Sequence, residues 1–517
     1  MPDAPLPDAY ARLEARFRRI ALLGEAGAVL HWDYAAVMPA RGTFIGFPIG
    51  AMPAGGADAR SEQLAELKAI SHGLLVSPET ADLIADAKAD AGNLSPWQAA
   101  NLNEIDRQHR RAGALDEAFV TRLSRASSTC EQAWRKARAA SDFSMVAAPL
   151  AELIGLVREE AARIGEVFDL SPYDALLDSY EPGGRAADID PVLDDLAGFL
   201  PGFLDEVLAH QAAQGPVLIP EGPFAEETQR RLGMKFMDVL GFDFEHGRLD
   251  VSHHPFCGGI PDDVRITTRY DENDFTSALM GVLHETGHAL YEQGLPKQWR
   301  LQPVGSALGM SIHESQSLLM EMQVCRSPEF LEFALPIIRE TFAGKGPAWD
   351  ADNILRLYHT VARSFIRVDA DEVTYPLHVI VRYRLEKDII AGKLNAADIP
   401  EAWNANFRDL IGVEVPNDAL GCLQDIHWYD GALGYFPTYT LGAMTAAQVY
   451  QAACAANPAI PDNVAKGDFS NLLTWLRENI HANGRLLSGP DLLTKATGRP
   501  LEAAPFKAHL KARYLPG

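Results

Sequence analysis

The sequence predicts a mainly α-helical protein that carries one small β-sheet. Apolar residues recur at three- and four-residue intervals along most of the 517-residue chain, which is the period of an amphipathic helix. Residues 247–271 differ, because short β-favouring runs there are divided by Gly258-Gly259 and Pro261-Asp262. That pattern predicts a hairpin or a small sheet edge. Hydrophobic residues make up 47% of the chain, which is ample for a large buried core.

The predicted elements follow one another without a low-complexity linker. Ser95-Pro96 and Asp188-Ile189-Asp190-Pro191 are typical of helix starts, where a capping residue precedes a proline. Residues 38–60 are rich in Gly and Pro and predict a long loop. The predicted helical ranges are 8–31, 61–75, 97–140, 144–169, 190–213, 273–293, 306–325, 328–343, 352–363, 372–391, 398–411, 443–454, 468–482 and 489–496.

The absence of a linker and of internal repeats favours a single domain over residues 1–517. Within it we expect an N-terminal helical part over about 1–245, a catalytic part over about 246–440 and C-terminal helices over about 441–517. A formal net charge of −24 argues against nucleic-acid and anionic-membrane partners. Five scattered cysteines form no CxxC pair, which argues against a disulfide framework and a thiolate metal site. With no signal-peptide pattern and no apolar run of about 18 residues, we expect a cytoplasmic protein.

The strongest chemical signal is the segment His284-Glu285-Thr286-Gly287-His288. On a helix, His284 and His288 lie one turn apart on one face, where both imidazoles can bind a single metal ion. Glu285 lies beside that face and would act as the general base toward a water at the ion. Gly287 costs the helix about 1 kcal/mol against alanine, which indicates that another element approaches it closely.

A catalytic zinc site takes three protein ligands, so one more is expected downstream. Glu314 follows His288 by 26 residues, a gap that fits a helix, a turn and a second helix running back beside the first. Glu321 lies seven residues further on, about two turns along the same face. The spacing leaves both carboxylates as candidates for the third ligand, and the other one would then support the site.

Taken together, the ordered motifs resemble the carboxypeptidase Taq family of metallocarboxypeptidases (M32). This resemblance implies that Glu314 is the third metal ligand. It also implies a large helical gluzincin-type body with a deep substrate groove, similar to neurolysin-like peptidases, homodimer formation, and removal of single residues from peptide C-termini. The motifs are His254-Pro255-Phe256, Asp263-Val264-Arg265-Ile266-Thr267, His284-Glu285-Thr286-Gly287-His288, His313-Glu314-Ser315-Gln316, Ile366-Arg367-Val368-Asp369-Ala370-Asp371 and Gly421-Cys422-Leu423-Gln424-Asp425-Ile426-His427-Trp428.

Two segments depart from the family pattern. Where the family usually continues with Arg-Leu-Trp-Glu-Asn after Ser317, this chain has Leu318-Leu319-Met320-Glu321-Met322, which changes the packing of that helix or a dimer contact. The loop at 42–56 is longer than usual and includes Phe44, Phe47 and Met52. It is either a surface insertion or a cover over the mouth of the groove.

A carboxypeptidase must recognise a free terminal carboxylate, and an arginine fork suits this task because it is always charged and can bind both oxygens. Arg367 is the first candidate, with Asp369 and Asp371 close by in sequence. Arg265 is the second, and its alternative role is to hold the fold around the groove. His254, His427 and Tyr435 are candidate donors to the substrate or to an oxyanion. Gln424 and Asp425 are candidates for binding the substrate main chain or for fixing His427.

The sequence thus predicts a zinc metallocarboxypeptidase acting on peptides with a free C-terminal carboxylate. Two histidines and a glutamate suit zinc, and also accept cobalt or manganese. The first alternative is an oligopeptidase or dipeptidyl carboxypeptidase with the same site chemistry. The alternative of another class is a non-enzymatic helical binding protein, which would be expected to have lost Glu285 or a ligand.

Overall fold

The computed structural model describes residues 8–37, 56–252 and 255–516. The predicted loop at 42–56, apart from Gly56, and the predicted site residue His254 lie outside the described residues. Of the described helices, none is long and apolar enough to cross a membrane. The fold is mainly α-helical with one small sheet, as the sequence predicts.

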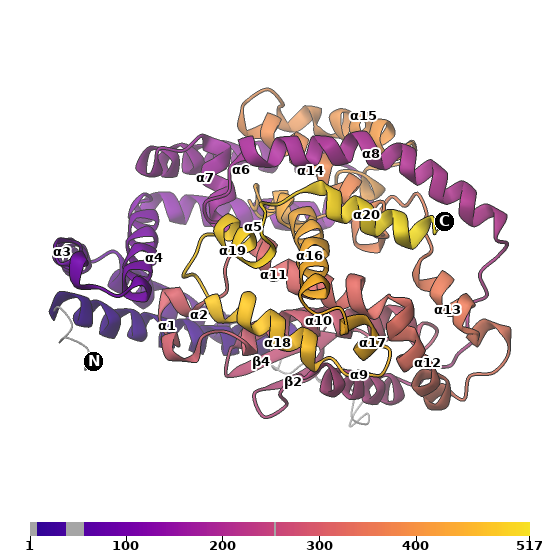
Figure 1. Cartoon of the computed structure of the whole chain (residues 1–517). Helices are drawn as coiled ribbons and strands as arrows, with labels where there is room; N and C mark the ends of the chain where they lie inside the picture. Colours follow the sequence, from indigo (N-terminus) through magenta and orange to yellow (C-terminus); the bar gives the residue numbers. More distant parts are fainter. Residues whose placement is uncertain (1–7, 38–55, 253–254, 517) are drawn as a thin grey trace.

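The helices are arranged in two tiers around a central helix (Figure 1). One tier contains α6 (Ser144–Phe168), α8 (Ala186–Ala213) and α14 (Tyr375–Ile390), which share a single hydrophobic core. The other contains the sheet and α10 (Phe275–Gln293), around a second core. Helix α16 (Pro437–Ala456) joins them, because its residues contribute to both cores.

The remaining helices complete these tiers and the N-terminal flank. They are α1 (Asp8–Ala35), α2 (Ala57–Leu75), α3 (Pro78–Ala89), α4 (Pro96–Gly113), α5 (Glu117–Ala140), α7 (Pro172–Tyr180), α9 (Glu226–Leu240), α11 (Met310–Leu318), α12 (Pro328–Phe342), α13 (Ala351–Tyr358), α15 (Ile399–Ile411), α17 (Ile460–Val464), α18 (Ser470–Asn479), α19 (Gly489–Thr497) and α20 (Ala503–Tyr514).

The sheet has four strands in the order β1-β2-β4-β3, with β1 at Ala36–Val37. The predicted hairpin is formed by β3 (Phe256–Ile260) and β4 (Asp263–Thr268), which pair antiparallel. Strand β2 (Gly247–Ser252) joins β4 in parallel, which the local sequence pattern did not predict. The sheet packs against α10 through β4 and β3 and so lies beside the segment that carries the metal-binding motif.

The start of α4 was predicted correctly from its local cap. The Ser95 hydroxyl accepts a hydrogen bond from the backbone N–H of Gln98, and the Gln98 side-chain oxygen accepts one from the backbone N–H of Ser95, which completes a capping box. The predicted start at Asp188–Pro191 was wrong, because α8 begins at Ala186. There the Ala186 N–H donates to the carboxylate of Asp174 at 2.7 Å, a cap from a different helix. Pro191 is instead accommodated inside the helix.

Other differences concern lengths. The predicted helix at 97–140 is two helices, because Asp116 caps the start of α5 at 2.8 Å from the Phe119 N–H. The predicted helix at 306–325 begins only at Met310 and changes to a π-helical segment, η5, at Leu319–Cys325. Five helices in the described part were not predicted at all: α3, α7, α9, α17 and α20.

Candidate metal centre

Helix α10 carries the His-Glu-x-x-His motif in a buried position. Its first turn is capped by Asp274, whose carboxylate accepts the N–H of Thr276 at 2.8 Å. A Cβ atom at Gly287 would clash with the Gln316 carbonyl oxygen and the Ser317 Cα of α11. Glycine at this position therefore lets α11 pack against α10, as the sequence predicts from the cost of a glycine inside a helix.

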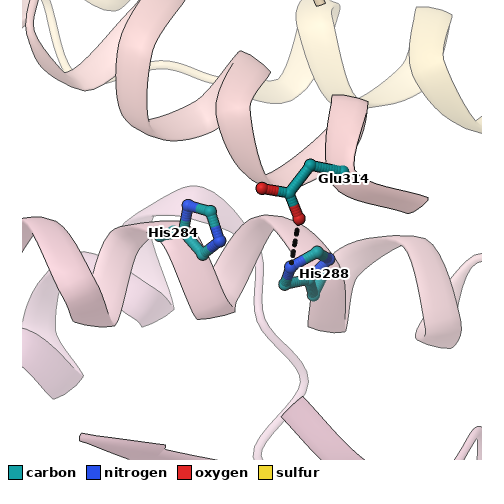
Figure 2. A group of neighbouring side chains, drawn as sticks. All are labelled: His284, His288 and Glu314. Carbon is teal, nitrogen blue, oxygen red and sulfur yellow. Dashed lines mark ion pairs between the residues drawn. The ribbon is translucent and has the colours of Figure 1, made fainter. Parts of the chain in front are cut away.

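This packing brings His284, His288 and Glu314 together (Figure 2). One ligand-type atom from each of the three lies within 4.8 Å of the other two. The His288 Nε2 and Glu314 Oε2 atoms are 3.5 Å apart. Two ligands that each lie about 2.1 Å from a tetrahedral ion are about 3.4 Å apart, so this pair already has the spacing of two zinc ligands.

In both His284 and His288 the Nδ1 atom makes a hydrogen bond, which leaves the Nε2 atom available to bind a metal ion. The Nδ1 of His284 lies 2.9 Å from Glu321 Oε2, and Glu321 is held by Arg326 at 2.6 Å. Glu321 therefore lies behind His284, and the three-residue group of the described chain contains Glu314 and not Glu321. The Nδ1 of His288 donates to the His313 carbonyl at 3.1 Å. A carboxylate or carbonyl on Nδ1 fixes the tautomer whose Nε2 carries the lone pair.

The electrostatics of this group fit a divalent cation. Burial raises the pKa of Glu285 to about 7 and raises the pKa of Glu314. Burial alone would lower the pKa of His284, but the hydrogen bond to Glu321 and the charge of Glu314 raise it to about 10, so the surroundings favour a positive charge on Nε2, supplied by a proton or by a metal ion in its place. Three buried carboxylates thus lie around two imidazoles, and a bound cation would compensate their charge.

Arg367 lies in a second buried cluster and is 5% exposed. Its Nε and Nη2 donate to Asp425 Oδ1 at 3.1 and 2.9 Å, and its Nη1 donates to the Tyr375 hydroxyl at 2.6 Å. Asp425 is shared with Arg382, whose Nε lies 2.7 Å from Oδ2. Two guanidinium groups therefore share one carboxylate. An arginine side chain has five N–H donors. On Arg367, one N–H of Nη1 and one N–H of Nη2 therefore make no hydrogen bond within the described part of the chain.

A sequence model of the carboxypeptidase Taq (M32) metallopeptidase family matches residues 49–514. The chain belongs to this family. It is 37% identical to thermostable carboxypeptidase 1 of Thermus thermophilus over 98% of both proteins, and 33% identical to carboxypeptidase 1 of Bacillus subtilis over 96% of both. Among solved structures, metallocarboxypeptidase 1 of Trypanosoma cruzi is similar, with a TM-score of 0.93 and 40% identity, covering 98% of this chain and 99% of the other. The M32 carboxypeptidase of Deinococcus radiodurans R1 has a TM-score of 0.90 and 35% identity, with the same coverage.

Membership in the M32 family confirms the predicted fold class and the predicted activity, that of a metal-dependent carboxypeptidase, which hydrolyses peptides. The activity requires a metal ion. The spacing, the ring tautomers and the charge of His284, His288 and Glu314 are compatible with binding such an ion.

The other predicted substrate residues of this M32 chain have different surroundings. Gln424 is fully engaged, because its Oε1 accepts the Arg367 N–H at 2.8 Å and its Nε2 donates to backbone carbonyls, among them that of Phe365. It therefore holds the Arg367 backbone, and its role in binding the substrate main chain stays a prediction. Arg265 pairs with Asp263 and lies 4.7 Å over the ring of Trp32, which matches the alternative role of holding the fold.

His427 and Tyr435 lie in the aromatic cluster around Arg367. Burial lowers the pKa of His427 to about 4, so its ring is neutral, and its Nε2 lies 3.4 Å from the Tyr439 hydroxyl. The Tyr435 ring packs edge-on against Tyr439 at 5.2 Å. Tyr375 and Tyr439 were not predicted as site residues, and Arg367 lies 4.9 Å over the Tyr439 ring. No helical spacing links Tyr439 to Tyr435, because α16 begins only at Pro437.

A cavity of about 720 Å³ adjoins the group formed by His284, His288 and Glu314. It is lined by α1, by β3 and by the side chains of Glu292 and His313. Tyr180, also on its wall, packs edge-on against Tyr435 at 5.0 Å. The described residues that line the cavity include neither Arg367 nor the three grouped residues, so the cavity borders the metal centre through His313 rather than enclosing it.

Proposed function

We propose that this chain is a zinc carboxypeptidase that releases single residues from peptide C-termini, with the metal held by His284, His288 and Glu314. The observation that carries the proposal is the convergence of His284, His288 and Glu314, which each bring one ligand atom within 4.8 Å of the others. Two histidines and one glutamate are a ligand set typical of zinc peptidases, and cobalt or manganese could replace zinc in it. When bound, the ion supplies the Lewis acidity that activates water and polarises the scissile carbonyl.

Glu285 is the proposed proton acceptor. Its side chain is buried at 7% exposure on the same helix as the two histidines, and burial raises its pKa to about 7. A carboxylate in these surroundings can take a proton from the attacking water and then hand it to the leaving amine. Because Glu285 is adjacent to His284 in the chain, α10 holds the base and the two histidine ligands in one helix, whereas Glu314 comes from α11.

Arg367 is proposed to bind the terminal carboxylate of the peptide. Its two free N–H donors and the excess of positive charge over Asp425 favour an anion at this position. The positive charge of Arg367 acts to lower the pKa of Glu314, which supports the proposal that the two clusters form one site. His427, Tyr435 and Tyr439 would donate hydrogen bonds to the reacting carbonyl or the carboxylate. The cavity beside His313 would receive the upstream part of the peptide.

The test combines metal analysis with product analysis. We expect one zinc ion per chain, and mass spectrometry of a digested peptide should show a ladder with steps of single residues from the C-terminus. Loss of dipeptides or internal cleavage would instead identify the alternative, an oligopeptidase or dipeptidyl carboxypeptidase. A peptide with an amidated C-terminus is the matched control, and it should be a poor substrate.

We also propose that the protein is a cytoplasmic homodimer. All five cysteines are free thiols, which favours a reducing compartment. The dimer is carried over from the family resemblance, and sedimentation equilibrium tests it: a monomer mass of 56.4 kDa across the concentration range would contradict the proposal.

A further inference from the structure

His284 and His288, which form the metal group together with Glu314, are held by different contacts. His284 contacts a carboxylate directly, because its Nδ1 lies 2.9 Å from Glu321. The Nδ1 of His288 contacts His313 twice, with the carbonyl oxygen at 3.1 Å and the ring Nδ1 at 2.7 Å. The other ring nitrogen of His313, Nε2, lies 2.9 Å from Glu292 Oε1. His288 and Glu292 are four residues apart on α10, so His313 of α11 bridges two positions of one helix face.

These contacts assign each proton. The carbonyl oxygen of His313 can only accept, so the Nδ1 of His288 must carry a hydrogen. The Nδ1 of His313, 2.7 Å away, must then accept that same hydrogen. Neutral His313 therefore has its own hydrogen on Nε2, which faces the Glu292 carboxylate. As a result, the lone pair of His288 lies on Nε2, the atom 3.5 Å from Glu314.

We infer that His313 and Glu292 are positioning residues that hold His288 in the tautomer and orientation needed for metal binding. The inference rests on the proposed ligand role of His288. We call the chain of contacts from His288 through His313 to Glu292 the relay. Both ring nitrogens of His313 make contacts in this relay, so His313 supports the metal group without belonging to it. The relay ends at the wall of the 720 Å³ cavity, where the side chains of His313 and Glu292 are 16% and 23% exposed. The His284 arm ends instead in the buried pair of Glu321 and Arg326.

Three substitutions test the relay in the full chain. Glu292→Met removes the acceptor at similar size, and Glu292→Gln keeps an oxygen that can accept from His313. The matched control is Asp243→Asn, because Asp243 lines the same cavity and pairs with a different histidine, His246, at 2.7 Å. It removes the same charge from the same wall without touching a residue of the metal group.

The readouts are zinc affinity, by competition with a chromophoric chelator, and the visible absorption of the Co²⁺-loaded protein, which reports ligand geometry. We expect Glu292→Met to weaken zinc binding about 10-fold, at the low end for supporting residues since the His313 carbonyl remains as an acceptor. Its cobalt spectrum should also change. Glu292→Gln should recover most of the affinity, and Asp243→Asn should match wild type. If Glu292→Met does not fold, His313→Gln must give the same loss, because it removes the ring and keeps the carbonyl.

Wild-type zinc affinity and an unchanged cobalt spectrum in a folded Glu292→Met or His313→Gln variant would overturn the relay. A His288→Ala variant separates this failure from failure of the proposed function. If His288→Ala loses zinc while the relay variants keep it, only the relay is wrong. If His288→Ala binds zinc as wild type does, the ligand assignment is wrong and the relay with it.

Discussion

Replacing Arg367 by methionine should abolish the preference for a free C-terminal carboxylate. Methionine keeps the length of the side chain and removes the charge and all donors. Asp425 keeps Arg382 at 2.7 Å, so the substitution does not leave a buried carboxylate without a partner. The effect should therefore fall on substrate rather than on folding. Removing the Arg367 partner of the buried substrate carboxylate should cost about 3–5 kcal/mol, which is roughly a 10²- to 10⁴-fold loss in kcat/KM.

The assay compares one peptide as free acid and as C-terminal amide. Wild type should cleave the free acid far faster, whereas Arg367→Met should cleave both equally slowly, because the donor fork that distinguishes them is gone. Arg367→Lys should lie between, since lysine keeps the charge but cannot bind the two oxygens with a planar fork. The zinc content should be the same in all three proteins.

Arg265→Met is the matched control, because Arg265 is bound to Asp263 and Trp32 and lies in the sheet. It should lower the melting temperature while preserving the preference for the free acid over the amide. The reasoning is refuted if Arg367→Met still prefers the free acid more than 10-fold, or if Arg265→Met loses that preference.

Three further predictions follow from the same geometry. Glu285→Gln should retain stoichiometric zinc and lose roughly 10²- to 10⁴-fold in kcat, the range for a general base; substantial residual activity would exclude Glu285 from that role. A chelator should abolish activity, and zinc or cobalt should restore it; activity in metal-free protein would contradict the metal assignment. Glu386 is buried, which raises its pKa from 4.5 to about 7, so its contribution to stability is present below pH 4.5 and is lost as the pH rises through about 7, by up to about 3 kcal/mol. Urea unfolding between pH 5 and 8 should show this decline and a flatter profile for Glu386→Gln; parallel profiles would refute it.

The sequence predicted the parts of the site that depend on local spacing. A four-residue interval on a helix fixes His284 and His288 on one face, and Asp274 caps that helix through its own neighbours. Spacing could not choose between Glu314 and Glu321, because seven residues are about two turns and both lie on one face. The choice depends on how α11 packs on α10, which is a property of the assembled fold.

The features of the fold and site that could not be predicted from the sequence depend on contacts between distant segments. Gln424 was predicted to bind substrate because it is a polar residue in a site motif. In the fold, its side-chain amide is hydrogen-bonded to the backbone around Arg367, 57 residues away. Arg382 lies in none of the predicted motifs. It reaches the site only because α14 places its side chain beside Asp425. The start of α8 was misplaced for the same reason, since its cap comes from Asp174 of another helix.

Gly442 provides a test of such a contact. A Cβ atom there would lie 2.8 Å from the Cβ and Cγ atoms of Glu314, so α16 packs directly on the proposed ligand. Gly442→Ala should push the Glu314 side chain away from His288 and weaken zinc binding, although alanine favours a helix by about 1 kcal/mol over glycine.

Gly281→Ala is the control, because Gly281 lies inside α10 and its nearest atom to an added Cβ is 3.9 Å away. Both substitutions change a glycine inside a helix, so propensity raises the stability of both by a similar amount. Gly281→Ala should raise the melting temperature and leave zinc affinity unchanged, while Gly442→Ala should lower zinc affinity. Equal zinc affinity in the two variants would show that α16 does not set the position of Glu314, and that α10 and α11 alone determine the geometry of the metal centre.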